Sequence, residues 1–308
     1  MNRIAYFGKL PARSDFVKSQ HDQPLMAVLD EWLAKVMSAL PANARWKIHY
    51  DALAPVSFAF VGPRSRHAIG GHIVASSDQS GRRFPFLMMR SCEVGDPGTL
   101  LPVSPIAFAP LWAACEAAVA GKGDPAMHLN ALGDAAPGID LHGQRRLDAF
   151  VSTSTIGDLD ALLGQPAKPV ILALGLLLQP VMHTSAADMD KSLVLPLPGS
   201  SQRHVVAAFW LHLISPFLAQ ANVELAIFLT LSDGKPVLVV GFSGACATAL
   251  QAIIDPQLGQ EQQVTFDDMA WIEEQHEVDL RALASYLDQP QLPLNMACEL
   301  FVQTYVGA

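Results

Sequence analysis

Three apolar segments follow one another closely in the first third of the chain, and their spacing constrains the possible folds more than any other feature. They are Val56–Val61, Ala68–Ala75 and Phe84–Ser91. The turns between them, Gly62-Pro63-Arg64 and Asp78-Gln79-Ser80-Gly81, are short and rich in turn-forming residues. Connections this short pair neighbouring strands antiparallel. The sequence therefore predicts an antiparallel sheet in this region.

Helices are expected to pack on this sheet. The apolar run Ile4–Phe7 predicts one more strand, and Pro24–Leu40 predicts a helix because its apolar residues recur at helical spacing. Ile106–Ala120 predicts a second helix, and Asp124–Leu132 predicts a third. The order of strand, helix, three strands and helix is typical of an α+β (mixed α/β) fold, with a mostly antiparallel sheet and flanking helices.

A turn-rich stretch over residues 137–168 is the candidate boundary between two units. The predicted organisation is an N-terminal domain over residues 1–136, a connecting region over 137–168 and a C-terminal domain of unknown role over 169–308. The C-terminal domain is expected to be a second sheet-and-helix module. Its predicted strands are Val170–Leu178, Leu193–Leu197, Leu225–Leu231 and Pro236–Gly241, and its predicted helices are Val205–Leu218, Cys246–Ile254 and Asp267–Leu287.

The composition is that of a globular protein with an uneven distribution of charge. Hydrophobic residues make up 51% of the chain and charged residues 16%, which is too apolar for a disordered protein. The first 90 residues hold 12 Lys and Arg against 6 Asp and Glu, whereas residues 91–308 hold 8 against 23. These two parts either present surfaces for different partners or neutralise one another in the fold. The acidic excess argues against binding of nucleic acid.

The sequence gives no indication of export or of insertion into a membrane. Met1-Asn2-Arg3 leads directly into an expected strand, without a long apolar leader segment. The apolar stretches at residues 170–178 and 205–218 are too short or too interrupted to span a bilayer. The four cysteines are far apart and form no C-x-x-C pair, as is typical of a reducing compartment. We therefore expect a cytoplasmic protein.

Two short motifs carry most of the functional information. The first, GKLPARSDF, runs from Gly8 to Phe16, and the second, SDQSGRRFPF, runs from Ser77 to Phe86. Together they resemble the N-terminal signature of the TagF family, also called ImpM, of type VI secretion system-associated proteins. The family pattern runs roughly G-K-L-P-x-x-G-D-F and then S-x-D-x-x-G-R-x-F-P. This chain departs from the pattern at Ser14, where the family has glycine.

The resemblance implies a bacterial, non-enzymatic regulator of type VI secretion that acts in the cytoplasm after translation. Proteins of this family are thought to repress assembly or firing, opposing or bypassing a threonine-phosphorylation pathway. The implied partner is the forkhead-associated-domain scaffold protein of that system. A structural subunit of the secretion complex is an alternative. The sequence has neither G-x-G-x-x-G nor G-x-x-x-x-G-K-[ST], and no cluster of metal-ligating residues, so no cofactor or metal is expected.

Six charged residues of the two motifs are the candidate partner-binding residues. They are Lys9, Arg13, Asp15, Asp78, Arg82 and Arg83. Adjacent residues of a strand point to opposite faces, so only one of the two arginines can face a shared site. An ion pair of Arg82 with Asp15 or Asp78 would suit the matching geometry of guanidinium and carboxylate. These charges could instead fix the two loops as structural ion pairs, and the sequence leaves both roles open.

A different class of function is suggested further along the chain. Ser243 lies between an apolar strand and an expected helix, as in the nucleophile elbow of serine hydrolases, and Asp267 or Asp268 and then His276 follow in hydrolase order. However, Ala245 replaces the last glycine of that motif. An Asp-Gly turn just upstream also predicts antiparallel pairing, whereas an elbow requires a parallel unit. A serine hydrolase is therefore the alternative to a non-enzymatic regulator.

Overall fold

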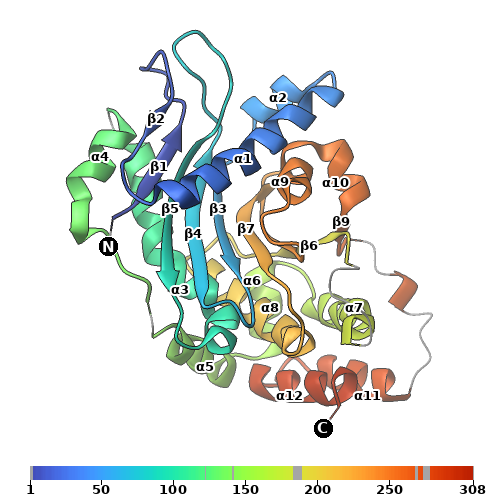
Figure 1. Ribbon diagram of the computed structural model, residues 1–308. Coiled ribbons are helices and arrows are strands. Elements are labelled where there is room, and N and C mark those ends of the chain that lie inside the picture. The colour runs from blue at the N-terminus through green and yellow to red at the C-terminus, as the bar shows by residue number, and fades with distance from the viewer. Residues whose placement is uncertain are drawn as a thin grey trace.

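The computed structural model describes residues 3–121, 123–140, 142–182, 189–267, 270–272 and 278–307. Within these residues the strands form one sheet in the order β2-β1-β5-β4-β3-β7-β8-β6-β9 (Figure 1). The strands are β1 Ala5–Gly8, β2 Val17–Lys18, β3 Val56–Val61, β4 His67–Val74, β5 Phe86–Glu93, β6 Ser192–Pro196, β7 Leu225–Ser232, β8 Lys235–Gly241 and β9 Gln263–Thr265. Neighbouring strands pair antiparallel except β6 and β9, which are parallel. The fold is α+β, as the sequence predicts.

Helices cover both faces of this sheet (Figure 1). Helices α1 (Gln23–Ala39) and α9 (Ala247–Ile254) pack on one face, and α3 (Pro97–Ala120) and α8 (Arg203–Leu218) pack on the other. The remaining described helices are α2 Trp46–Asp51, α4 Pro125–Leu132, α5 Gly143–Thr153, α6 Ile156–Leu163, α7 Ala167–Leu178, α10 Pro256–Gln262, α11 Val278–Leu287 and α12 Leu294–Tyr305, with short 3-10 helices at Leu40–Ala42, Gly133–Ala135, Gln179–Met182 and Ala270–Ile272.

Strand β3 illustrates how the sequence builds a core on each face. Phe58 and Phe60 belong to the core beneath α1 and α9, whereas Ala59 and Val61 belong to the core beneath α3 and α8. Trp32 of α1 packs against both phenylalanines, at ring-centroid distances of 6.1 and 5.3 Å. Because alternate residues of a strand face opposite sides, a strand that is buried on both faces is mostly apolar, and Ser57 is the one polar residue of β3.

The strands of the two predicted modules belong to one sheet rather than to two. Strand β3 pairs antiparallel with β7, with Phe58 opposite Phe228 and Phe60 opposite Ala226. This pairing joins the N-terminal strands β1–β5 to the C-terminal strands β6–β9. Each module alone would leave a largely apolar strand at an open edge, and pairing the two edges satisfies their backbone hydrogen-bonding groups. The domain bounds at residues 1–136, 137–168 and 169–308 stay a prediction.

The segment Val170–Leu178 is a helix, not the strand that its run of apolar residues predicts. It forms most of α7, and its residues are largely buried. A short uninterrupted apolar run fits a buried strand and a buried helix equally well. Contacts with a distant segment distinguish helix from strand here. The ring of Tyr305 on α12 lies directly against Gly175, where no side chain separates the two helices. Of the helix expected over Asp267–Leu287, α11 forms the last part, while residues 268–269 and 273–277 lie outside the described residues.

Helix α3 is long and apolar enough to cross a membrane, judged by length and composition alone, which the sequence reasoning did not recognise. The pair Ile156–Leu163 and Ala167–Met182 passes the same test with a bend of 98° between its parts. In this fold α3 and α8 pack against each other on the same face of the sheet. Its Trp112 donates a hydrogen bond to the carbonyl of Phe58 at 3.0 Å. Core helices of soluble proteins pass this test as well.

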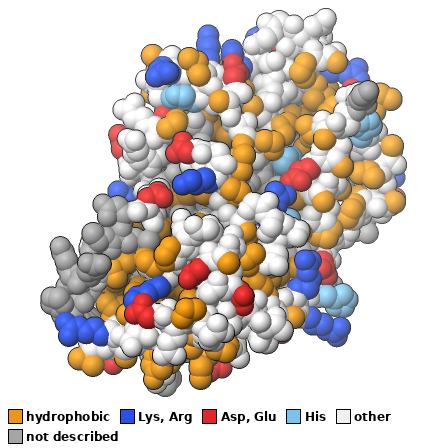
Figure 2. All heavy atoms as spheres, turned by 180° about the vertical axis from the view of Figure 1, so that it is seen from behind, with side chains coloured by type: hydrophobic (Ala, Val, Ile, Leu, Met, Phe, Trp, Pro, Cys, Tyr) orange, Lys and Arg blue, Asp and Glu red, His pale blue; other side chains and the backbone are white. Residues whose placement is uncertain are grey.

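The basic first part of the chain and the acidic remainder neutralise one another in part. Arg3 pairs with Asp134 at 3.1 Å, and Arg13 pairs with Asp124 at 2.7 Å. Figure 2 shows basic and acidic side chains interspersed over the face that it presents. The difference in charge between the two parts of the sequence therefore does not create a broad basic or acidic area on that face.

Candidate functional site

The two motifs lie side by side at one end of the sheet. Strand β1 ends at Gly8, and the first motif continues as a loop, while the second motif forms the turn between β4 and β5 (Figure 1). The backbone N–H of Gln79 donates to the carbonyl of Arg13 at 2.9 Å. The Ser76 hydroxyl donates to the carbonyl of Lys9 at 2.6 Å. These bonds hold the two loops together as one unit.

Asp78 is the centre of this unit, and its side chain is buried. Oδ1 accepts hydrogen bonds from the Ser80 and Arg82 backbone N–H groups, both at 3.0 Å, and from the Ser80 hydroxyl at 2.7 Å. Oδ2 accepts from Arg82 Nε at 2.7 Å and pairs with Lys9 Nζ at 3.0 Å. Burial alone would raise the pKa of Asp78, but these donors outweigh it and hold the pKa well below its usual value. The carboxylate is therefore ionised and fully bonded.

Of the two ion pairs considered for Arg82, the structure forms the one with Asp78. Asp15 instead accepts a hydrogen bond from the backbone N–H of Phe16 at 2.8 Å. Arg82 also donates to the carbonyl of Ser14 at 3.2 Å, which ties the second motif to the first. Lys9 is buried and serves the same cluster. Lys9, Asp78 and the Nε group of Arg82 therefore fix the shape of both loops.

The exposed side chains around this cluster include two arginines, an aspartate and a phenylalanine, and we call these four the motif surface. They are Arg13, Asp15, Phe16 and Arg82. The Arg82 side chain is 66% exposed and that of Arg13 is 52% exposed. Phe16 packs edge-on against Phe84 at 4.9 Å, and Lys9 Nζ lies 5.1 Å from its ring centroid. The motif surface thus combines two cations, one anion and an aromatic ring on a rigid base.

Arg83 lies apart from the motif surface. Its guanidinium donates two hydrogen bonds to the carboxylate of Asp51 on α2, at 2.7 and 2.5 Å. The two adjacent arginines thus take different partners, although both precede β5 and the expected alternation of strand residues does not apply to them. The sequence reasoning missed Asp51 and also Asp124, the N-cap residue of α4 that pairs with Arg13. Both lie far from the motifs in sequence, so no local pattern could have identified them.

The surroundings of Ser243 differ from those of a nucleophile elbow. The strand before it, β8, pairs antiparallel with both of its neighbours, β7 and β6. An elbow lies between a strand and a helix of a parallel βα unit, and that unit is not present around β8. The Ser243 side chain is exposed, and Asp268 and His276 lie outside the described residues. Within the described part of the chain, no group of three potential metal ligands is found.

Comparison with known proteins identifies the region that carries both motifs. Residues 5–137 match the family model described as TagF N-terminal domain, Type VI secretion system-associated. The chain carries a TagF N-terminal domain. No curated protein matches the sequence. The crystal structure of PA0076 from Pseudomonas aeruginosa PAO1 is similar at 23% identity and a TM-score of 0.35, over 44% of this chain and 62% of that chain. The similarity thus spans about three fifths of that chain's length.

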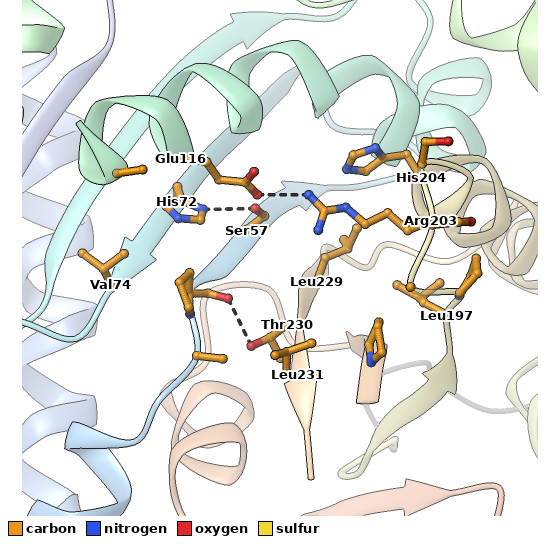
Figure 3. Close-up of a pocket in the computed structure, with 18 of the residues that line it drawn as sticks. Ser57, His72, Val74, Glu116, Leu197, Arg203, His204, Leu229, Thr230 and Leu231 are labelled. Atoms are coloured by element: carbon orange, nitrogen blue, oxygen red, sulfur yellow. Dashed lines mark hydrogen bonds and ion pairs between the residues drawn. The ribbon is translucent and has the colours of Figure 1, made fainter. Parts of the chain in front are cut away.

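A pocket of about 910 Å³ lies at the seam between the TagF N-terminal domain and the rest of the chain (Figure 3). The domain contributes residues of β3, β4 and the end of α3, and the remainder contributes residues of β7, β8 and the start of α8. Ser57 and His72 are opposite one another on β3 and β4, and Ser57 Oγ lies 3.0 Å from His72 Nδ1. Arg203 on α8 pairs with Glu116 on α3 at 3.1 Å. The sequence analysis did not predict this site.

The two histidines of the pocket are neutral at physiological pH. Burial, and then the neighbouring charge of Arg203, lower the pKa of His72 to about 4. Burial and the same arginine, with a smaller contribution from Arg146, lower the pKa of His204 to about 4 as well. Both effects disfavour the protonated ring, the first because the charge loses its hydration and the second because like charges repel.

Acidification is expected to destabilise the protein through His72. Its pKa is about 4 in the folded protein, against an ordinary value of 6.5, so the unfolded chain binds the proton more readily between these values. The contribution of neutral His72 to the free energy of unfolding is therefore present above pH 6.5 and is lost below it. The loss is about 2 kcal/mol at pH 5 and about 3 kcal/mol at pH 4. Urea unfolding of the native protein and of His72→Asn at pH 7.5 and pH 5 measures this. An equal pH dependence in both proteins would contradict the assignment.

Proposed function

We propose that this protein is a cytoplasmic, post-translational regulator of a bacterial type VI secretion system, and that it represses the system by binding its forkhead-associated-domain scaffold. The TagF N-terminal domain supports the association with type VI secretion. The motif surface supports the choice of binding as the activity. Its four side chains are exposed, yet their loops are fixed by the buried Lys9–Asp78 pair. A surface ordered before binding loses less conformational entropy when a partner docks.

Repression by binding requires a difference in affinity between two states of the scaffold. A ligand shifts an equilibrium only as far as it prefers one state over the other. The regulator would therefore bind more tightly to the form of the scaffold that does not promote assembly. Arg13 and Arg82 would meet acidic groups of the scaffold and Asp15 a basic one, while Phe16 is an aromatic anchor of the kind that dominates many interfaces.

Binding to the purified scaffold tests this proposal, with the scaffold titrated in phosphorylated and unphosphorylated form. Asp15→Ala is the sharpest variant, because the Asp15 carboxylate bonds only the adjacent Phe16 N–H among the described residues. We expect this variant and Arg13→Ala each to weaken binding about tenfold, as residues central to an interface do. The matched controls are Glu299→Ala and Arg145→Ala, exposed residues on α12 and α5 at the other end of the molecule (Figure 1).

Different results of this titration would contradict or support the proposal. If Asp15→Ala and Arg13→Ala fold normally and bind the scaffold as well as the two controls do, the motif surface is not the binding site. Binding that is lost only in variants with a lowered melting temperature would assign the motifs a purely structural role. Saturable binding that weakens in the folded motif variants alone supports the proposal.

Deletion of the gene separates a repressor from a structural subunit of the secretion complex. A repressor's absence is expected to leave type VI secretion unchanged or higher, because the scaffold then is no longer held inactive. Overproduction is expected to lower secretion. The measurement is the amount of protein that the type VI system secretes into the culture medium. Complete loss of secretion on deletion, restored by the intact gene, would favour the structural alternative.

A further inference from the structure

The pocket at the seam has the size and lining of a small-molecule site. Its volume of about 910 Å³ falls in the range of ligand-binding cavities, which is roughly 300–1,000 Å³. Such sites combine mostly apolar walls with a few convergent polar groups. No residue of the motif surface lines this pocket, so a ligand here would bind independently of the proposed scaffold contact.

The polar groups of the pocket gather around Arg203. Its side chain is 43% exposed and its only ion-pair partner among the described residues is Glu116, itself 40% exposed. Ion pairs this accessible to water are weak, so Arg203 can exchange Glu116 for the anionic group of a ligand. Arg203 also stands in the first turn of α8, a helix of 16 residues, and the dipole of a helix favours an anion at this end.

His72 supplies an independent indication that a polar ligand belongs here. The side chain is only 2% exposed and lines the pocket. Its Nδ1 is occupied by Ser57, but Nε2 has no hydrogen-bond partner among the described residues. Among the described residues, the buried side-chain nitrogen or oxygen without a partner is His49 Nδ1, so His72 Nε2 is open to the space of the pocket. Water or a polar group of a ligand in the pocket can therefore bond to Nε2.

The remaining wall of the pocket is aliphatic. Its apolar side chains include Val74, Val119, Leu197, Leu229 and Leu231. Figure 3 shows Leu229 and Leu231 on β7, and Leu229 is in register with Ser57 of the neighbouring strand β3. Leu231 is 49% exposed and leaves apolar surface open to solvent at the pocket. The lining thus offers a charged group at one place and a hydrocarbon surface beside it.

We propose that this pocket binds a small amphipathic carboxylate, with its anionic head on Arg203 and its aliphatic body against the leucine and valine wall. The carboxylate displaces Glu116 from the guanidinium, which can hold it by two parallel hydrogen bonds. At neutral pH the site holds one net positive group for the ligand once Glu116 has moved away. Because the pocket is lined from both parts of the chain, the bound molecule contacts the TagF N-terminal domain and the C-terminal part together.

Calorimetric titration of the whole chain with octanoate tests this, with 1-octanol as the uncharged probe of equal chain length. We expect saturable binding of octanoate at one site and binding of 1-octanol at least about tenfold weaker, since hydrogen bonds to charged groups are the stronger ones. Arg203→Ala is expected to weaken octanoate binding to the same degree. Glu116→Gln is expected to strengthen it, because the variant removes the competing carboxylate.

Two further variants locate the site. Val119→Trp fills the cavity from α3 and is expected to abolish octanoate binding, while Arg145→Ala on α5 is expected to leave it unchanged. The melting temperature of each variant shows that it is folded. Equal affinity for octanoate and 1-octanol, or unchanged octanoate affinity in folded Arg203→Ala, would overturn the proposal. The absence of saturable octanoate binding below its micelle concentration would overturn it as well.

Discussion

Gly8→Ala is expected to destabilise the protein by about 2–6 kcal/mol, a large part of the roughly 5–15 kcal/mol that holds a typical domain folded. Two effects add. The backbone of Gly8 has φ +132°, which residues with a side chain rarely adopt. A Cβ at this position would also collide with the Pro85 carbonyl oxygen and lie 2.8 Å from Phe86 Cα. Both are backbone atoms at the start of the paired strand β5, where Gly8 lies opposite Phe86, so neither can move aside without disturbing this pairing.

Gly81→Ala is the matched control for this prediction. Gly81 also has a positive φ, +78°, but nothing lies within 4 Å of the place where its Cβ would be. Its substitution therefore carries the backbone strain without the collision, about 1–2 kcal/mol. Chemical denaturation of both variants separates the two effects. If Gly8→Ala and Gly81→Ala lose the same free energy of unfolding, the close approach of β1 to Pro85 is not the reason for the glycine.

Asp78→Ala is expected to lower the melting temperature by several degrees and to release both motif loops. The substitution removes the acceptor of five hydrogen bonds and ion pairs and leaves the buried ammonium of Lys9 without its carboxylate. Removing one partner of a buried ion pair is strongly destabilising, because the other charge stays uncompensated. Scaffold binding should fall too, since the motif surface loses its base. Thermal unfolding and limited proteolysis of residues 9–16 and 77–84 measure these effects.

Asp134→Ala serves as the control, because the Arg3–Asp134 pair is exposed on both sides. A change in melting temperature as small as that of Asp134→Ala would show that the Asp78 cluster does not hold the loops. The effect also has a pH signature. Since the pKa of Asp78 is lowered in the fold, its stabilisation is present above the usual carboxyl range and is lost as the pH falls through the lowered value. Asp78→Ala should therefore be less sensitive to acid than the native protein.

Local patterns predicted those parts of the fold that local residues determine. The antiparallel pairing of β3 with β4 follows from a connection of only five residues, and the structure confirms it. Strands β4 and β5 also pair antiparallel as predicted, although the connection between them, residues 75–85, is longer. The Arg82–Asp78 pair could be predicted from the sequence because the two residues are four apart in one turn. The apolar run Val170–Leu178 was not, because its length and composition suit a strand as well as a helix, and its contact with Tyr305 is set by a distant segment.

The pairing of β3 with β7 could not be predicted for the same reason. Phe58 and Phe228 are 170 positions apart, and nothing in either strand specifies the other as its partner. The pocket could not be predicted from the sequence either, because its residues also come from distant segments. Ser57 and His72 are ordinary residues of two strands, and Arg203 becomes notable only when α8 is placed beside α3. Sites assembled from distant segments carry no local signature, in contrast to the two motifs, whose loops are built mainly from neighbouring residues.

The pairing of β3 with β7 has a practical consequence for work with the TagF N-terminal domain. A fragment that ends at residue 136 retains β1–β5 but exposes the hydrogen-bonding edge of β3 from Val56 to Val61. Apolar edges of this kind recruit strands from other molecules. Such a fragment would self-associate, and its loss of activity would say nothing about where partners bind. The bounds of a sequence family show which segment occurs together in related proteins. Whether that segment folds alone depends on whether its backbone hydrogen bonds are all satisfied within it.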